Sequence, residues 1–256
     1  MTKSGLQVAK GEPAINNGPR QLIRNVAAEF GVQGLEIEIS IPEGVELAKK
    51  TLNPILGVVG GLSVIGTTGV LRPMSEEAFK NSLVPQMDVA IAAGFTTLIF
   101  VPGKIGEVAA INLGFDSQAI VQTSNFIGYM LDAAVDRKVD EIILCGHIGK
   151  LVKVAAGIFH THNRVADGRL ETLAAYCAAE GMSAVEVQKI LDATTTEVAA
   201  EIISANNFNH VYKKIAARAS YRAERYTFNK IRVKTIMLNY AGKILGTDNL
   251  LLITDR

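Results

Sequence analysis

Short apolar strands alternate with amphipathic helices between about residues 35 and 160, and this alternation constrains the fold more than any other feature. The runs TTLIFVPG, AIVQTS and EIILCGH predict buried strands, and the longer segments KIGEVAAINLGF, NFIGYMLDAAVDRKV and GKLVKVAAGIF predict helices. Strands that are joined through helices form largely parallel sheets with helices on their faces. We therefore predict an α/β fold with a layered mixed or parallel sheet flanked by helices.

Further elements are expected on both sides of this alternation. The period-two pattern of GLEIEISIPEG predicts a half-buried strand, and ILGVVGGLSVIG predicts a buried strand or strand pair. VELAKKTL predicts a short helix, and Ser75 is a natural N-cap for a long helix to about Ala93. A helical C-terminal half, closed by the β segments IRVKTIMLNY and KILGTDNLLLI, is expected, with helices at 168–180, 183–192, 194–204 and 207–225; another helix is expected at 21–30.

The charge balance and the cysteines argue against several classes of protein. A formal net charge of +1 argues against a nucleic-acid binder that depends on bulk electrostatics. The two cysteines, Cys145 and Cys177, lack metal-ligand spacing, and the first twenty residues contain no apolar leader. The apolar run before Arg72 is interrupted by too many glycines for a membrane helix. A cytoplasmic protein without nucleic-acid or membrane partners is expected.

The stretch GVVGGLSVIGTTGVLRPMS is rich in glycine but matches neither the dinucleotide fingerprint nor a Walker loop. Glycines allow a ligand to approach the backbone and free amides to face an anion, so a carboxylate with neighbouring hydroxyls fits this loop. A tight bulge that packs a strand against a helix is the alternative. Pro102 and Gly103 end a predicted strand, where α/β sheets often bind ligands, but this signal alone favours the alternative, an ordinary turn between a strand and a helix. The candidate loop residues are Gly60, Gly61, Gly66, Thr67, Thr68 and Gly69.

The stretch LCGHIGKLVKVAAGIFHTHNRVADGR contains three of the four histidines and four basic residues. His147 and Lys150 are expected where a strand ends and a helix begins, a position that attracts anions. Lys153 belongs to a helix that is apolar nearly all round, so an anionic ligand or an acidic partner is expected beside it. A zinc site at His160 and His162 lacks a recognised ligand spacing, and histidines hydrogen-bonded to backbone groups are the remaining alternative.

Two arginines follow the histidines. Arg164 and Arg169 flank Asp167, and guanidinium groups suit carboxylate ligands because they bind them through two hydrogen bonds. Asp167 is expected to orient one of them. A helix N-cap at Asp167 with surface arginines is the alternative.

Five strings together resemble one known family: GEPAIN (11–16), ELAKKTLNP (46–54), GVVGGLSVIGTTGVLRPMS (57–75), VPGKIGE (101–107) and GHIGKLVKVAAGIFHTHNRVADGR (146–169). On these strings the chain resembles the cobalt-precorrin-5B C(1)-methyltransferase family, often called CbiD. The resemblance implies methyl transfer from S-adenosylmethionine to ring carbon 1 of a cobalt corrinoid, giving cobalt-precorrin-6A in anaerobic cobalamin biosynthesis. It also implies that cobalt arrives within the substrate, so that the protein needs no metal site of its own.

The resemblance also implies roles for the candidate residues. The glycine-rich loop, with Pro102 and Gly103, is expected to hold S-adenosylmethionine. His147 is the candidate catalytic residue, and a positioning role suits it equally well. The acetate and propionate arms of the corrinoid are expected to meet a substrate-binding set: Lys150, Lys153, Thr161, His162, Arg164, Asp167 and Arg169.

The family pattern includes a further N-terminal segment ahead of GEPAIN. Residues 1–50 are therefore expected to be a remnant of a first α+β part, and residues 51–256 the main α/β domain. A separate chain that supplies the segment is one expectation, and a homo-oligomer is another. The alternative function is that of a shortened, non-catalytic homologue that binds a corrinoid or a partner chain.

Overall fold

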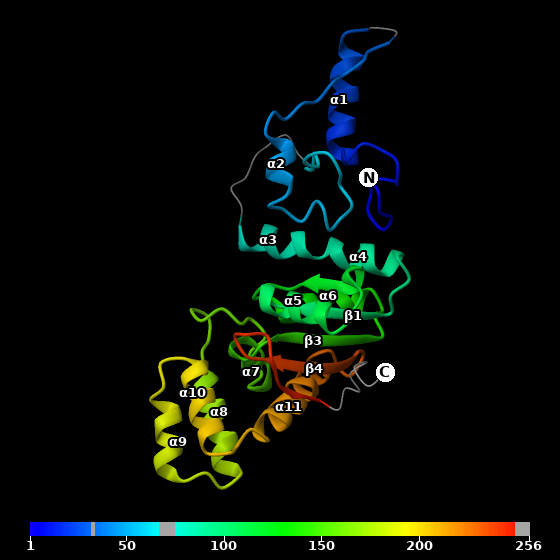
Figure 1. The fold of residues 1–256 in the computed structure, drawn as a ribbon. Helices are drawn as coiled ribbons and strands as arrows, with labels where there is room; N and C mark the ends of the chain where they lie inside the picture. Colours follow the sequence, from blue (N-terminus) through cyan, green and yellow to red (C-terminus); the bar gives the residue numbers. More distant parts are fainter. Residues whose placement is uncertain (32–33, 67–74, 249–256) are drawn as a thin grey trace. The chain divides into compact units, whose positions relative to one another are not determined.

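The protein is described from a computed structural model that defines residues 1–31, 34–66 and 75–248 (Figure 1). The chain divides into two compact units, Met1–Gly94 and Phe95–Arg256. The boundary between residues 50 and 51 was predicted from the two parts of the family pattern, not from the compactness of the chain. That boundary stays a prediction. Thr67, Thr68 and Gly69 lie outside the described residues.

A five-stranded mixed sheet forms the centre of the second unit (Figure 1). Its strands are β1 (Thr97–Val101), β2 (Ile120–Gln122), β3 (Glu141–His147), β4 (Arg232–Leu238) and β5 (Ile244–Thr247). Their order is β2-β1-β3-β4-β5, with the first four parallel and β5 antiparallel to β4. The predicted α/β class, the mixed sheet and the two closing β segments are confirmed.

Helices cover both faces of this sheet, which explains why its central strands are apolar without alternation. On one face, α5 (Lys104–Asn112) packs against Ile143 and Cys145 of β3. On the other, Ser220 of α11 donates a hydrogen bond to Thr235 of β4 at 2.9 Å. This second face also carries α6 (Ile127–Asp136) and α7 (Ile148–Ala155), which contact α11 (Val211–Tyr226). A short 3-10 turn, η1 (Ser117–Ala119), precedes β2.

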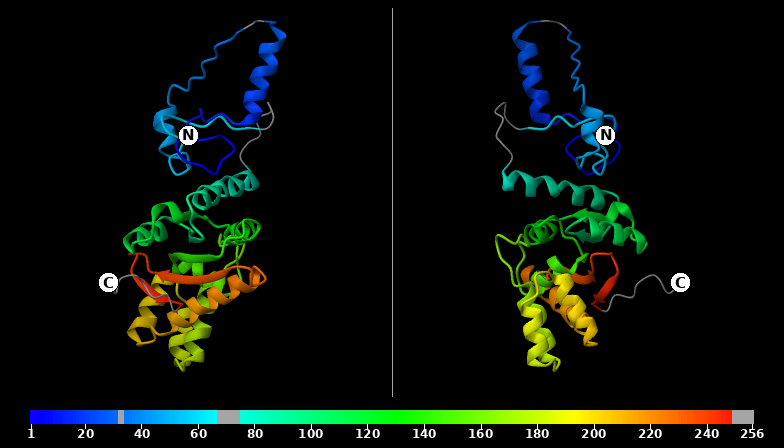
Figure 2. Two further views of the ribbon diagram at one scale, coloured as in Figure 1. Left: turned by 90° about the vertical axis from the view of Figure 1, so that its right-hand side faces the viewer. Right: turned by 60° about the vertical axis from the view of Figure 1, so that its left-hand side comes forward.

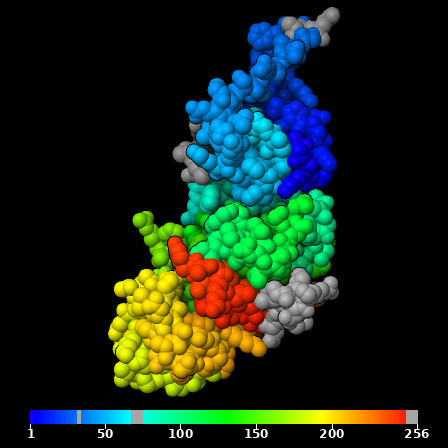
Figure 3. Space-filling view, in the orientation of Figure 1, coloured from blue at the N-terminus to red at the C-terminus, as the bar shows by residue number. Residues whose placement is uncertain are grey.

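Three further helices form a group beside α7 and α11: α8 (Arg169–Ala179), α9 (Ala184–Leu191) and α10 (Thr196–Ala205). The space-filling view shows α9 and α10, in yellow, as a lobe next to the orange α11 (Figure 3). Side-chain oxygens of Ser183 and Thr195 cap α9 and α10 by accepting amide hydrogen bonds. The predicted C-terminal helices are confirmed.

Both cysteines are buried and unpaired in the second unit. Burial raises the pKa of the Cys145 thiol to about 12 and that of Cys177 to about 11, because an apolar environment disfavours the thiolate. Across the described residues, no helix has both the length and the apolar character that spanning a bilayer requires.

The first unit contains α1 (Asn17–Glu29), α2 (Gly44–Ala48), α3 (Glu76–Leu83) and α4 (Pro85–Ala92). Ser75 caps α3 as predicted, since its hydroxyl accepts a hydrogen bond from the amide of Ala78 at 3.1 Å. The predicted long helix is divided at Pro85, which has no amide hydrogen to donate.

Both strands predicted in the first unit are wrong. Residues 35–41 are extended and exposed, but they pair with no strand among the residues that the structure describes. ILGVVGGLSVIG forms turns, and its only ladder contact in the described chain is an isolated bridge between Ile15 and Val64. Alternation predicts a strand only where a neighbouring strand is present to pair with it.

Candidate functional site

The candidate site lies where β1 and β3 end side by side. The chain leaves β1 through α5 toward β2 on one side, and leaves β3 through α7 toward β4 on the other. In open α/β sheets, the C-terminal strand ends beside such a reversal are the usual ligand position, and this place is called the crevice here. The Nζ of Lys150 donates to the carbonyl oxygen of Pro102 at 2.5 Å, which joins the two turns, and Gly103 lies beside it. The structure therefore brings together two predicted parts of the site.

His147 is the last residue of β3 and is held through both ring nitrogens. Its Nδ1 accepts a hydrogen bond from the Gly149 amide at 3.1 Å, and its Nε2 lies 2.6 Å from Oε1 of Glu197. Because Nδ1 accepts, the proton of the neutral ring is on Nε2 and is donated to the carboxylate. This geometry occupies the lone pair that a general base would use.

Glu197 and Tyr240 belong to this site although the sequence analysis did not identify them. Glu197 stands in the first turn of α10, where an acidic residue is commonly explained by the helix dipole alone. Tyr240 follows β4, and its exposed ring lies 5.9 Å from that of His147 in an edge-to-face arrangement. Tyr240 could have been identified from its position as the last residue of the predicted β segment IRVKTIMLNY, because parallel strands end at the same sheet edge as His147.

The protonation states follow from burial and from neighbouring charges. Burial lowers the pKa of His147 from its ordinary value of 6.5, and the Glu197 carboxylate opposes this shift only in part. Burial also lowers the pKa of Lys150, and the charge of Lys153 adds to the effect. Since folding favours the neutral imidazole, the stability that His147 contributes is present above pH 6.5 and is lost as the pH falls through its lowered pKa.

Lys153 is fully buried and holds the loop between α7 and α8, residues 156–168. Its ammonium donates to Thr161 O at 3.1 Å, Asn163 Oδ1 at 2.6 Å and Ala166 O at 2.9 Å. Asp167 lies 4.0 Å away. The three acceptors use all three N–H donors of the Lys153 ammonium. The acidic partner that was expected beside Lys153 is therefore supplied by the chain itself.

The rest of the predicted substrate-binding set divides into buried and exposed members. Thr161 is buried, and its amide donates to the carbonyl oxygen of Asn125 at 2.9 Å. Asp167 accepts two hydrogen bonds from the Arg169 guanidinium, at 2.8 and 2.7 Å, and these hold the pKa of Asp167 below its usual range. His162 and Arg164 are exposed on the same loop. Lys150 contacts Pro102 at the end of β1, and the charge of Arg169 acts on both His147 and Glu197, so both cations belong to the candidate site.

The glycine-rich loop lies in the first unit, and its described glycines differ in their surroundings. A Cβ on Gly57 would lie 2.6 Å from Lys3, so close packing explains that glycine. Gly60 and Gly61 have open space where a Cβ would stand, and their amides make no hydrogen bond within the described chain. Gly66 is exposed. With respect to the described residues, Gly60 and Gly61 therefore present amides without a hydrogen bond, as an anion-binding loop requires.

The zinc alternative finds no cluster of ligands in the described part of the chain. There, no group of three or more His, Cys, Asp or Glu side chains is placed to hold a metal ion. The rings of His160 and His162 are 6.5 Å apart, and His160 packs edge-to-face on Phe126 at 5.0 Å.

Replacing Glu197 with glutamine is expected to lower the pKa of His147 further. The change removes the negative charge that raises this pKa, while the amide oxygen still accepts from Nε2. An NMR titration of the imidazole measures the shift. Glu201→Gln, at an exposed position of the same helix, is the matched control and should leave the titration unchanged. An unchanged or raised pKa in Glu197→Gln would show that the carboxylate does not act on the ring.

The fold defines an α/β protein with a candidate ligand site at the C-terminal ends of its parallel strands. The family model described as CbiD matches residues 1–73, and the model of the CbiD C-terminal domain matches residues 160–249. The chain belongs to the CbiD family, which confirms the resemblance seen in the sequence. No solved structure matched the chain.

Curated relatives match almost the whole chain. A protein of Moorella thermoacetica named cobalt-precorrin-5B C(1)-methyltransferase is 52% identical over 252 residues, covering 97% of this chain and 69% of the relative. Proteins of the same name from Desulfitobacterium hafniense and Methanocaldococcus jannaschii are 45% and 47% identical. The matches cover 97% and 96% of this chain, and 65% and 69% of the two relatives, respectively. The chain thus spans roughly two thirds of these relatives.

Proposed function

We propose that the chain is a methyltransferase that methylates ring carbon 1 of cobalt-precorrin-5B in cobalamin biosynthesis. The observation that carries this proposal is the 52% identity, over 97% of the chain, to a relative of that name. The match extends over both units, so it includes the glycine-rich loop and the crevice. The geometry of both places supports the proposal.

The crevice suits a flat macrocycle that carries carboxylate arms. Lys150 and Arg169 present cationic groups there, and charge-assisted hydrogen bonds to carboxylates are the strong ones. An anion beside Lys150 would stabilise its charged form, which burial disfavours. Asp167 orients the guanidinium of Arg169, while His162 and Arg164 extend the basic surface along the loop. Lys153 and Thr161 shape the loop from within.

His147 positions the crevice in this proposal and does not act as a base. Its ring ties the end of β3 to α10 through Glu197 while its other nitrogen caps α7. Methyl transfer is a displacement in which the protein mainly aligns the two reactants and excludes water. Because both ring nitrogens of His147 have partners within the chain, its ring is held in place and is suited to aligning the two reactants.

S-adenosylmethionine, when bound, supplies the methyl group carried on its sulfonium, and the product of the reaction is cobalt-precorrin-6A. The free amides of Gly60 and Gly61 fit the carboxylate of that molecule. Gly66, Thr67, Thr68 and Gly69 extend the same loop, and Pro102 and Gly103 are further candidates in the second unit. The cobalt ion belongs to the substrate.

Calorimetric titration with S-adenosylhomocysteine tests the donor site. Gly61→Val is expected to weaken binding by about tenfold or more, since its side chain would occupy the space in front of the free amides. Gly34→Val is the matched control, because Gly34 likewise has nothing within 4 Å of a Cβ and ordinary backbone angles. Absence of binding by the unmodified chain, or equal binding by Gly61→Val, would contradict the assignment of the loop.

Binding of a corrinoid without catalysis is the second candidate function. Single-turnover assays with cobalt-precorrin-5B and S-adenosylmethionine separate the two. Methylated product supports the transferase, whereas corrinoid binding without product supports the second candidate.

A further inference from the structure

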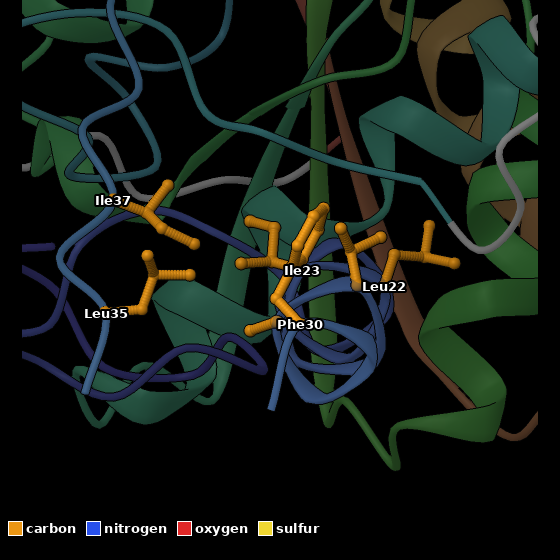
Figure 4. Close-up of a pocket in the computed structure, with 7 residues that line it drawn as sticks. Leu22, Ile23, Phe30, Leu35 and Ile37 are labelled. Carbon is orange, nitrogen blue, oxygen red and sulfur yellow. The ribbon is translucent and has the colours of Figure 1, made fainter. Parts of the chain in front are cut away.

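An apolar groove runs along the first unit between α1 and residues 35–41. It has a volume of about 570 Å³ and a wholly apolar lining: Leu22, Ile23, Val26, Ala27, Phe30, Leu35 and Ile37. Figure 4 shows Leu35 and Ile37 on one side, facing Ile23, Leu22 and Phe30 of the helix side. No residue of α1 is buried, and Phe30 is 73% exposed. So much exposed apolar surface on one helix indicates a site of interaction.

The extended wall of this groove has the form of a strand without its neighbour. Leu35, Ile37, Ile39 and Ile41 alternate with Glu36, Glu38 and Ser40, and all are exposed. Within the described chain, the backbone of residues 35–40 makes no hydrogen bond. Both views in Figure 2 show α1 and this segment running in opposite directions. An unpaired apolar strand is a template for another strand, which adds through backbone hydrogen bonds.

We propose that this groove docks an extended polypeptide segment of the kind that the relatives carry in the third of their length outside the match. The CbiD family model matches residues 1–73, so the groove lies within the part of the chain that this model matches. The relatives combine this region with additional polypeptide, because the match covers 65–69% of them but 96–97% of this chain. The inference does not depend on the proposed methyl transfer.

The chemistry of the groove specifies the occupant further. The added strand would place apolar side chains against Ile23 and Leu35 and basic side chains opposite Glu36 and Glu38. A second copy of this chain is disfavoured, because antiparallel self-pairing would bring these glutamates together. An anionic lipid surface is disfavoured by the same two charges. The expected partner is therefore a segment that alternates apolar residues with lysine or arginine.

The test uses the part of the Moorella thermoacetica relative outside the match, produced as a separate polypeptide and titrated into the full chain. Binding is expected, and Ile37→Lys should weaken it at least about tenfold, because the variant loses the apolar contact of the isoleucine and places a charge in the groove. Val185→Lys is the matched control: Val185 is 67% exposed on α9, outside the groove, and its change should leave binding intact. Equal binding by Ile37→Lys would overturn the proposal.

A fusion covers the case in which the separate polypeptide does not fold. The same part of the relative, joined to the chain by a Gly/Ser linker, is expected to protect the amides of residues 35–40 from hydrogen exchange. In the chain alone these amides exchange freely, since they make no hydrogen bond to the described residues. Absence of protection in the fusion would refute the docking site. Light scattering measures whether the chain alone forms a dimer. A dimer that dissociates in Ile37→Lys would also refute the proposal, because the occupant of the groove would then be a second copy.

Discussion

Replacing Lys153 with methionine is expected to lower the free energy of unfolding by about 2–3 kcal/mol, although methionine fills nearly the same space. The change leaves three acceptors, Thr161 O, Asn163 Oδ1 and Ala166 O, without the donor that joins them. Removal of a buried charge compensates in part, so the loss stays below the sum of three charged hydrogen bonds. Urea unfolding, followed by circular dichroism, measures the difference.

The same variant should release the loop of residues 156–168, because the ammonium of Lys153 joins Thr161 and Ala166 of this loop to α7. Limited proteolysis is expected to cut there faster than in the unmodified protein. Lys189→Met is the control: Lys189 makes an exposed ion pair with Glu186, worth about 0.5 kcal/mol or less. A Lys153→Met protein as stable as the control would mean that the loop is held by other contacts.

Gly106→Ala is expected to destabilise the protein by about 3 kcal/mol, although alanine in place of glycine usually stabilises a helix by about 1 kcal/mol. An added Cβ would lie 2.2 Å from the carbonyl oxygen of Cys145 and 3.2 Å from Gly146 Cα, so α5 must move away from β3. Both contacts are backbone atoms, which cannot rotate aside. Thermal unfolding of the purified variant measures the effect.

Val108→Ala provides the control for this prediction on the same helix. Val108 is 45% exposed, and its truncation should change stability by less than about 0.5 kcal/mol. If Gly106→Ala proves neutral, α5 does not lie as close to β3 as the structure shows. If it is destabilising, the turn at Gly103 and Lys104 is held by that close approach.

The sequence predicts the second unit well because its signals are local. Each strand is a short apolar run and each helix follows it within a few residues, so periodicity and length are enough to separate them. The rule that ligands lie at C-terminal strand ends identified Pro102 and His147 separately, and the strand order of the structure makes their two turns neighbours.

The remaining features depend on contacts between distant parts of the chain. Glu197 lies fifty residues after His147, and no spacing rule connects a helix first turn with the end of β3. The buried Lys153 was recognised as unusual, but its acceptors are mainly loop carbonyls, which sequence letters do not reveal. In the first unit, the alternation at residues 35–41 is typical of a half-buried strand, but this segment pairs with no strand among the described residues, so the predicted element was wrong.

The burial of Cys145 and Cys177 has a consequence for labelling chemistry. With thiol pKa values of about 12 and 11, the thiolate at neutral pH amounts to on the order of one molecule in 10⁵ and 10⁴. Alkylating reagents attack the thiolate and need access to it, so the folded chain is nearly inert toward them. A cysteine introduced on the surface would therefore accept a fluorophore or spin label selectively, with both native thiols left in place.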